Sequence, residues 1–180
     1  MADPVLFPSR PRRGLIVLLA GLIAALALIA APARAAGIVV NSPNNDLTDT
    51  NGECTLPEAI LNADTNNELS GGDCTAGGGA DTIAFAGDYT INVVSLLVTD
   101  SAGLVIDGTG RNVTISGSDT SSLFQVAASG SLELRALTLR DGLATEGGGL
   151  YNAGELTVLD STLIGHTATG AGGAIYNSTG

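Results

Sequence analysis

The chain has 180 residues and a formal charge of −11, which is enough for one modest domain behind a targeting segment. Only three of its seven basic residues follow residue 35, against 17 acidic residues, so this remainder carries a formal charge of −14. Because no basic patch can displace counterions from phosphates, nucleic-acid binding is excluded. Glycine is about twice as frequent as its ordinary ~7%, but aliphatic residues are common enough to exclude a disordered chain.

The first 35 residues have the pattern of an export signal. Three arginines between residues 10 and 13 precede an uninterrupted apolar stretch, residues 14–30, and small residues follow it. This pattern predicts a signal peptide over residues 1–35, cleaved after Ala33, Ala35 or Ala36. An uncleaved anchor is the alternative, since the apolar stretch approaches the length of a membrane span. We therefore expect a protein that is secreted or held at the cell surface or outer membrane, with no membrane span in the mature chain.

The two cysteines, Cys54 and Cys74, are the only ones in the chain. In an oxidising compartment, an even pair predicts a disulfide rather than a metal or catalytic site. A bridge that closes about 20 residues stabilises a fold by about 3 kcal/mol in the chain-entropy model. A disulfide would also leave no free thiol for catalysis.

Residues 36–79 are predicted to form a small cap before the rest of the chain. A short strand at residues 38–40 leads into a polar loop. Thr55 and Glu58 then form a capping box, which predicts a brief helix that ends before Asn66. The glycine-rich loop that follows carries Cys74, so the predicted disulfide lies within this cap.

An internal repeat of about 24 residues determines the predicted architecture of residues 80–180. Aliphatic residues recur at this spacing: Leu132 with Leu156, Leu134 with Val158, and Leu139 with Leu163. Short alternating strands with glycine corners at such a period are typical of a solenoid. Leucine-rich repeats have a similar period but need a helix-sized stretch, which is lacking. We therefore predict an all-β fold, a right-handed parallel β-helix with rungs of about 24 residues.

Within each rung, alternate residues are expected to point inward and to stack on their equivalents in the next rung. The leucines at 132, 134, 137 and 139 would be inside, with Glu133, Arg135, Thr138 and Arg140 facing water. At the next repeat, Tyr151 would stack on Tyr176, and Asn152 would form an amide ladder with Asn177. The chain ends within a repeat, so we expect a fragment truncated at its C-terminal end.

Two sets of residues resemble known families. The segment Gly52–Ile60, with Ala80–Ile83 and Gly87–Ile91, resembles the N-terminal CSLREA domain of exported bacterial β-helix proteins. The repeated Gly-Gly-x-Ile/Leu-Tyr-Asn steps resemble those of polymorphic outer-membrane protein and pectate-lyase-like solenoids. Pro57 replaces the arginine of the CSLREA motif, so any ion pair of that arginine is absent. The resemblance implies a surface-attached or secreted protein of adhesin or passenger type, and it implies no defined reaction.

A calcium site is one interpretation of the polar loop before the helix. Asp49, Asn51, Gly52 and Glu58 match positions 3, 5, 6 and 12 of an EF-hand loop. Position 1 is Leu47, however, and Glu58 already has a role in the capping box. The alternative is a polar loop that leads into a helix, and we expect no other cofactor.

Candidate catalytic residues are scattered along the repeats. His166 has no serine or cysteine beside it, so we expect an exposed turn histidine rather than a general base. A polysaccharide lyase would need carboxylates for calcium and a basic residue, for which the candidates are Asp107, Arg111, Arg135, Arg140, Asp141 and Asp160. We expect a non-enzymatic adhesin that binds a polysaccharide or another cell-surface ligand. The alternative is a pectate-lyase-like or glycosidase-like enzyme whose catalytic part lies beyond residue 180.

Overall fold

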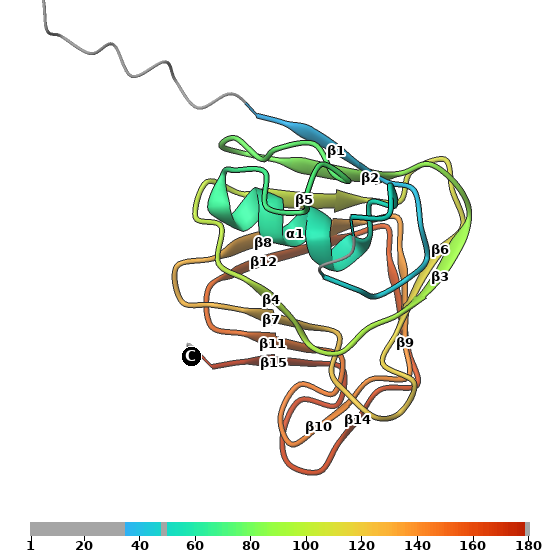
Figure 1. The fold of residues 1–180 in the computed structure, drawn as a ribbon. Helices are drawn as coiled ribbons and strands as arrows, with labels where there is room; N and C mark the ends of the chain where they lie inside the picture. Colours follow the sequence, from blue (N-terminus) through green and yellow to red (C-terminus); the bar gives the residue numbers. More distant parts are fainter. Residues whose placement is uncertain (1–34, 48–49, 179–180) are drawn as a thin grey trace, which may run out of the picture. The chain divides into compact units, whose positions relative to one another are not determined.

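The computed structural model describes residues 35–47 and 50–178 and shows a parallel β-solenoid of about four turns with one short helix (Figure 1). The predicted parallel β-helix is thus confirmed, whereas the predicted signal peptide lies almost wholly outside the described residues. The described residues belong to one compact unit. Within the described ranges, no helix combines the length and the apolar character needed to cross a membrane.

Three parallel sheets form the long faces of the solenoid. Sheet A contains β1 (Gly37–Val40), β2 (Thr82–Phe85), β5 (Leu104–Asp107), β8 (Ser131–Arg135) and β12 (Glu155–Leu159). Sheet B contains β3 (Tyr89–Asn92), β6 (Val113–Ser116), β9 (Thr138–Arg140) and β13 (Thr162–Ile164). Sheet C contains β4 (Leu96–Val98), β7 (Phe124–Val126), β11 (Leu150–Asn152) and β15 (Ile175–Asn177). A short fourth sheet pairs β10 (Leu143–Ala144) with β14 (Thr167–Ala168).

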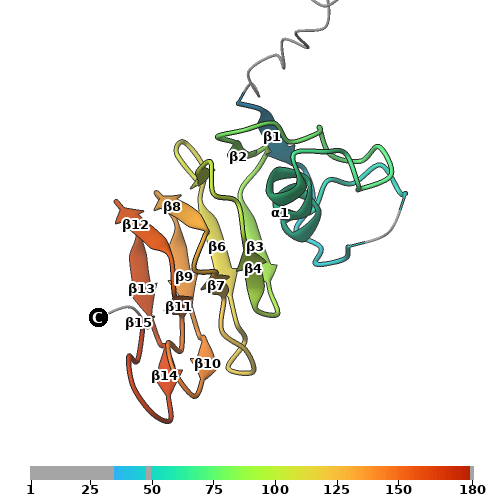
Figure 2. The same ribbon diagram turned by 90° about the vertical axis from the view of Figure 1, so that its left-hand side faces the viewer.

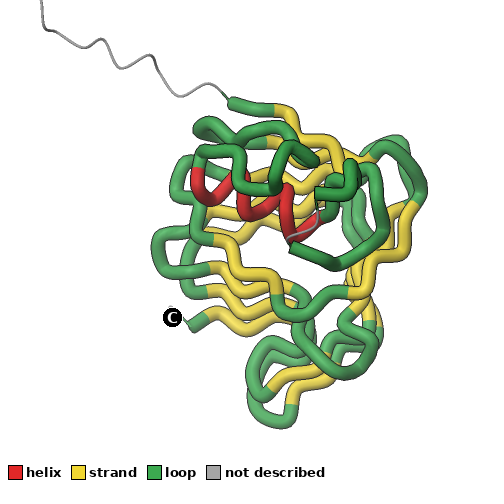
Figure 3. Tube along the Cα trace, in the orientation of Figure 1, coloured by secondary structure: helices red, strands yellow, loops and turns green. Residues whose placement is uncertain are grey.

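The predicted period of 24 residues is found at every step of sheet B, where Ile91, Ile115, Leu139 and Leu163 lie opposite one another in turn. Sheets A and C deviate from it at some steps. Ile106 in sheet A pairs with Leu134, which is 28 residues later. Loops between the faces absorb such insertions, because they lie outside the hydrogen-bonded strands (Figure 3).

The interior consists of aliphatic residues stacked from rung to rung. The four leucines predicted to point inward, at 132, 134, 137 and 139, are at most 2% exposed. Leu156 and Val158 in β12 are half-buried and pack against the same core. Burying a leucine or isoleucine contributes about 2 kcal/mol, so the stack is the main source of stability.

Two corners between sheets A and B use a left-handed backbone without glycine. Ala136 has a φ of 53° and Asp160, at the equivalent corner one coil later, has a φ of 49°. Aspartate tolerates this conformation more readily than alanine, because its short polar side chain can hydrogen-bond locally. The repeated corner geometry places the first residue of β9 and that of β13 in register.

The cap contains α1 (Leu56–Thr65), which is inserted between the neighbouring strands β1 and β2. The predicted capping box of Thr55 and Glu58 is present, and the helix ends at Asn66 in a left-handed conformation. Its apolar side contacts β1 and β4 at the end of the stack (Figure 2). Asp64 ties it there, since its carboxylate accepts the backbone N–H groups of Thr99 and Asp100 at 3.0–3.1 Å.

The predicted disulfide between Cys54 and Cys74 is confirmed, with a Cα–Cα distance of 4.8 Å. Both cysteines are buried beside the first turn of α1. The bridge joins the residue before the helix N-cap to the loop that follows the helix. The disulfide therefore fixes the loops on either side of the helix, which do not pair with any strand of the solenoid.

Candidate functional site

The outer face of sheet B carries one threonine in each coil. The parallel register pairs these residues in sequence, and we call them the threonine row: Thr90, Thr114, Thr138 and Thr162. Each is followed by an inward-pointing aliphatic residue, so the alternation of the strand turns the threonines outward. All four are exposed or half-buried. With neighbouring strands about 4.8 Å apart, the row presents four hydroxyl groups over about 14 Å.

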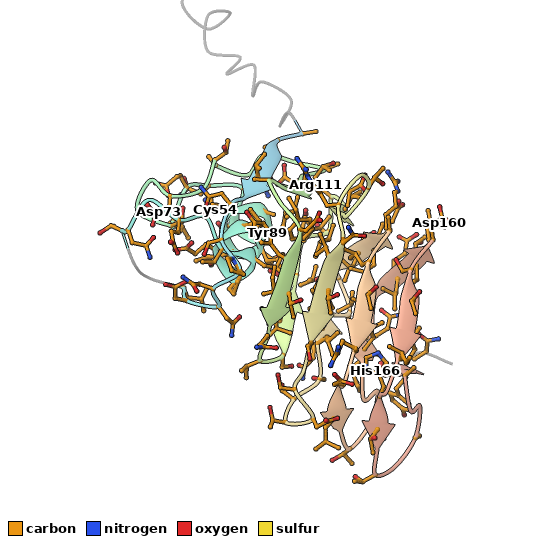
Figure 4. The ribbon with its side chains drawn as sticks, turned by 90° about the vertical axis from the view of Figure 1, so that its right-hand side faces the viewer. Cys54, Asp73, Tyr89, Arg111, Asp160 and His166 are labelled. Carbon is orange, nitrogen blue, oxygen red and sulfur yellow. A yellow bond between two sulfur atoms is a disulfide. The ribbon has the colours of Figure 1, made fainter. Side chains whose placement is uncertain are left out.

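A shallow pocket of about 210 Å³ borders the threonine row where the strands of sheet B begin. Its polar lining includes Arg111, Asn112 and Asp160, together with three members of the row. Figure 4 shows Arg111 and Asp160 at the same end of these strands, where Arg111 precedes β6 and Asp160 precedes β13. The pocket therefore combines a cation, a carboxylate, an amide and several hydroxyl groups on one surface.

Asp88 fixes one end of this pocket. Its two carboxylate oxygens accept hydrogen bonds from the backbone N–H of Asn112 at 2.9 Å and from its side-chain amide at 3.1 Å. These bonds lower the pKa of Asp88, and the nearby charge of Arg111 lowers it further. Asp88 is thus held ionised, and Asn112 is held in place beside the threonine row.

The other charged candidates do not line this pocket. Arg135 forms ion pairs with Asp107 at 3.3 Å and with Glu133 on the outside of sheet A. Arg140 pairs with the adjacent Asp141. Of the six residues considered for a lyase, the structure therefore brings Arg111 and Asp160 to one pocket and leaves the others in local ion pairs. In residues 35–47 and 50–178, no group of three or more histidine, cysteine, aspartate or glutamate side chains is arranged to hold a metal ion.

The residues considered for calcium have separate local roles. Asp49 lies outside the described residues. The side-chain oxygen of Asn51 accepts the backbone N–H of Glu53 at 2.8 Å. One carboxylate oxygen of Glu58 accepts the N–H and the hydroxyl of Thr55, each at 3.0 Å, and burial raises the pKa of Glu58. Glu58 thus completes the capping box with Thr55, the N-cap residue.

The expectation that His166 is an exposed turn histidine is wrong. It lies at the corner between β13 and β14, half-buried, and its Nδ1 atom accepts the backbone N–H of Gly142 at 3.0 Å. Gly142 is the residue 24 positions earlier, so this bond links two successive coils. Burial lowers the pKa of the imidazole below its usual 6.5. The side chain is a structural link, which the sequence pattern around one histidine does not reveal.

We expect acidification to weaken this link. Because the imidazole pKa is lower in the fold, the unfolded chain binds more protons in the pH window between the folded value and 6.5, and stability falls as the pH falls through it. His166 is the only histidine, so its pKa can be measured directly by NMR. Urea unfolding at neutral pH and at about pH 5 should show a smaller loss for His166→Asn than for the natural chain. A measured pKa of 6.5 or higher would contradict this expectation.

Sheet C brings the four ladder residues together. The rings of Tyr151 and Tyr176 lie 5.5 Å apart, tilted by 34°, on the outer side. The side-chain amide of Asn152 donates to the side-chain oxygen of Asn177 at 3.0 Å. Asn152 is buried, so this bond satisfies an amide that would otherwise be unpaired inside the solenoid.

No family model, curated protein or solved structure was found to match this chain. The class of protein, a parallel β-solenoid with a disulfide-linked cap, therefore rests on its own structure. Sequence reasoning missed the threonine row, although the threonines recur at the same 24-residue spacing as the aliphatic positions. The repeat is most evident in the aliphatic residues that point inward, whereas the threonine row consists of residues that point outward.

Proposed function

We propose that this chain is an exported, non-enzymatic surface protein of the adhesin or passenger type, which binds a polysaccharide along sheet B. The observation that carries the proposal is the threonine row with its adjoining pocket. The export-signal pattern of the first 35 residues, the disulfide and the resemblance to CSLREA-domain β-helix proteins support the cellular setting.

The chemistry of this face suits a sugar polymer. Each threonine hydroxyl offers one donor and two acceptor positions, and Asn112 and Arg111 add further donors. Sugar hydroxyl groups also both donate and accept hydrogen bonds, so they can replace the water molecules bound to these residues without loss of hydrogen bonds. Repetition at the strand spacing favours a ligand with a repeating structure over a single small molecule. Because the hydrogen bonds between strands already fix the backbone of sheet B, binding costs little conformational entropy of the protein.

The test is a double substitution in the middle of the row. Thr114→Val with Thr138→Val keeps the β-branched shape and removes two hydroxyl groups. For a polysaccharide identified on a glycan array with the natural chain, we expect at least roughly tenfold weaker binding by calorimetry, since each lost hydrogen bond is worth ~0.5–1.5 kcal/mol.

The matched control is Thr82→Val with Thr157→Val, which removes two threonines from the outer side of sheet A. We expect this control to bind like the natural chain. Equal losses in the two variants, or an array without any bound glycan, would refute polysaccharide binding by sheet B.

A further inference from the structure

Two aspartates are buried together at the start of the solenoid. Asp81, directly before β2, is fully buried, and Asp100, two residues after the end of β4, is 3% exposed. The negative charge of Asp81 acts on Asp100 and, with that of Asp64, adds to the effect of burial in raising the pKa of Asp100. A buried carboxylate is unfavourable in its ionised form unless hydrogen bonds and an opposite charge compensate it, and otherwise it tends to take up a proton.

No arginine of the described chain supplies that charge. Arg135 and Arg140 form their ion pairs with other acidic residues, and Arg111 lies beside Asp88. The chain contains no lysine, and the single histidine lies far along the sequence, in the last coil. Among residues 35–47 and 50–178, the remaining kind of cation that could lie beside these carboxylates is an α-amino group.

The hydrogen bonds of the two aspartates show where such a group would lie. One oxygen of Asp81 accepts the backbone N–H of Ala36 at 2.8 Å, and both its oxygens accept that of Gly78 at 3.0 Å. Asp100 accepts the backbone N–H of Ala102 through Oδ1, whereas its Oδ2 is buried without a partner. The nitrogen of Ala36 is thus already in contact with the buried carboxylate.

Ala36 is also the residue that follows one of the predicted cleavage positions. Its carbonyl accepts the backbone N–H of Thr82 at 2.9 Å, which sets the start of the β1–β2 pairing. Removal of the first 35 residues would leave this pairing intact. It would also convert the Ala36 amide nitrogen into an α-amino group, which has an ordinary pKa of about 7.7–8.0 and is largely protonated at neutral pH.

We propose that the export signal is cleaved after Ala35 and that the new α-ammonium group of Ala36 forms an ion pair with the buried carboxylate of Asp81. A signal peptidase supplies the reaction: water adds across the Ala35–Ala36 peptide bond, the C–N bond breaks, Ala35 leaves as a carboxylate and the Ala36 amine takes up a proton. Cleavage after Ala33 or Ala36 would not place the ammonium group at this nitrogen. The inference rests on the proposed export of the chain.

Processing and folding are coupled by this arrangement. Before cleavage, the buried carboxylate of Asp81 faces an uncharged amide at Ala36, so the uncleaved chain is less stable. After cleavage, the ammonium group contributes a full positive charge and two additional donor hydrogens at the same position. The mature chain is therefore stabilised at its first residue, where a terminus would otherwise fray.

The ion pair is tested with two purified chains that differ by one residue. One begins at Ala36 and the other at Ala35, so that the ammonium group is displaced while the sequence is otherwise unchanged. Urea unfolding at neutral pH is expected to give an equilibrium constant for unfolding roughly tenfold smaller for the chain that begins at Ala36. In the Asp81→Asn background, the difference between the two chains is expected to vanish. Equal stability of the two natural-sequence chains would overturn the ion pair.

A second measurement needs no substitution. The pKa of the α-amino group in the chain that begins at Ala36, followed by NMR of the labelled terminal residue, is expected to lie above 8 because the charged form is favoured by Asp81. An ordinary or lower value would overturn the ion pair, even if Asp81→Asn fails to fold.

The cleavage position is tested on the exported product by N-terminal sequencing. A first residue of Ala36 supports the proposal, whereas Arg34 or Gly37 overturns it while leaving export in place. A product that retains the first 35 residues would refute cleavage and speak against the proposed mature surface protein. These outcomes are separate from the glycan measurements, so a failure of polysaccharide binding and a failure of this inference can be told apart.

Discussion

Replacing Leu132 with alanine is expected to lower the free energy of unfolding by about 3 kcal/mol, as large-to-small substitutions in a packed core do. Leu132 is 1% exposed and stacks between Leu104 and Leu156 in the neighbouring coils. The hydrogen-bonded strands above and below keep their spacing, so the cavity cannot collapse. Urea denaturation followed by circular dichroism measures the loss.

The matched control is Leu156→Ala, which removes the same atoms one coil later. Leu156 is half-buried and packs against the core from one side, so its replacement is expected to lower stability by about 1 kcal/mol. Equal losses of stability at the two positions would contradict the expectation that the loss depends on how completely each leucine is buried.

Removal of the disulfide by Cys54→Ala with Cys74→Ala is expected to lower the free energy of unfolding by about 3 kcal/mol. The bridge closes a loop with a sequence separation of 20, and alanine avoids burying a hydroxyl group where each cysteine is buried. The loss should be local, because the solenoid strands pair without the cap loop. Hydrogen exchange is expected to accelerate in residues 53–79 and to change little in sheet B.

Reduction of the natural chain is the control for this double substitution. It should reproduce the loss of stability without any change of sequence. Unchanged urea midpoints in both experiments would show that the hydrogen bonds of the cap alone hold it, among them those from the side chain of Asn62 to Ser70 and to the carbonyl oxygen of Thr75.

The repeat made the solenoid predictable. Leu132, Leu134 and Leu139 alternate with polar residues and recur after 24 positions, and a parallel stack is the arrangement that buries such residues on one another. The helix was predictable for a different reason, since Thr55 and Glu58 form a local hydrogen-bonded cap within four residues. Both features depend on residues that are close in sequence or repeat regularly.

The pocket beside the threonine row and the contact between Ala36 and Asp81 were less predictable, because they join residues that are distant in the sequence. Arg111 and Asp160 are 49 positions apart and meet at one pocket because the intervening coils place them on the same side. The contact between Ala36 and Asp81 spans 45 positions and depends on the insertion of α1 between two paired strands. The first spacing exceeds two 24-residue repeats by one residue, and the second includes the inserted helix, so a strict repeat pairs neither set of residues.

The sequence by itself determined the class of fold, the disulfide pair and the residues that line the interior, because alternation and repetition specify which side of each strand avoids water. Only the tertiary structure decided which outward-facing residues share a surface and which buried charges lack a partner. The half-burial of His166 and the enclosure of Asp100 belong to this second group. Such properties depend on desolvation by segments distant in the sequence, and the coiling of the chain brings those segments together.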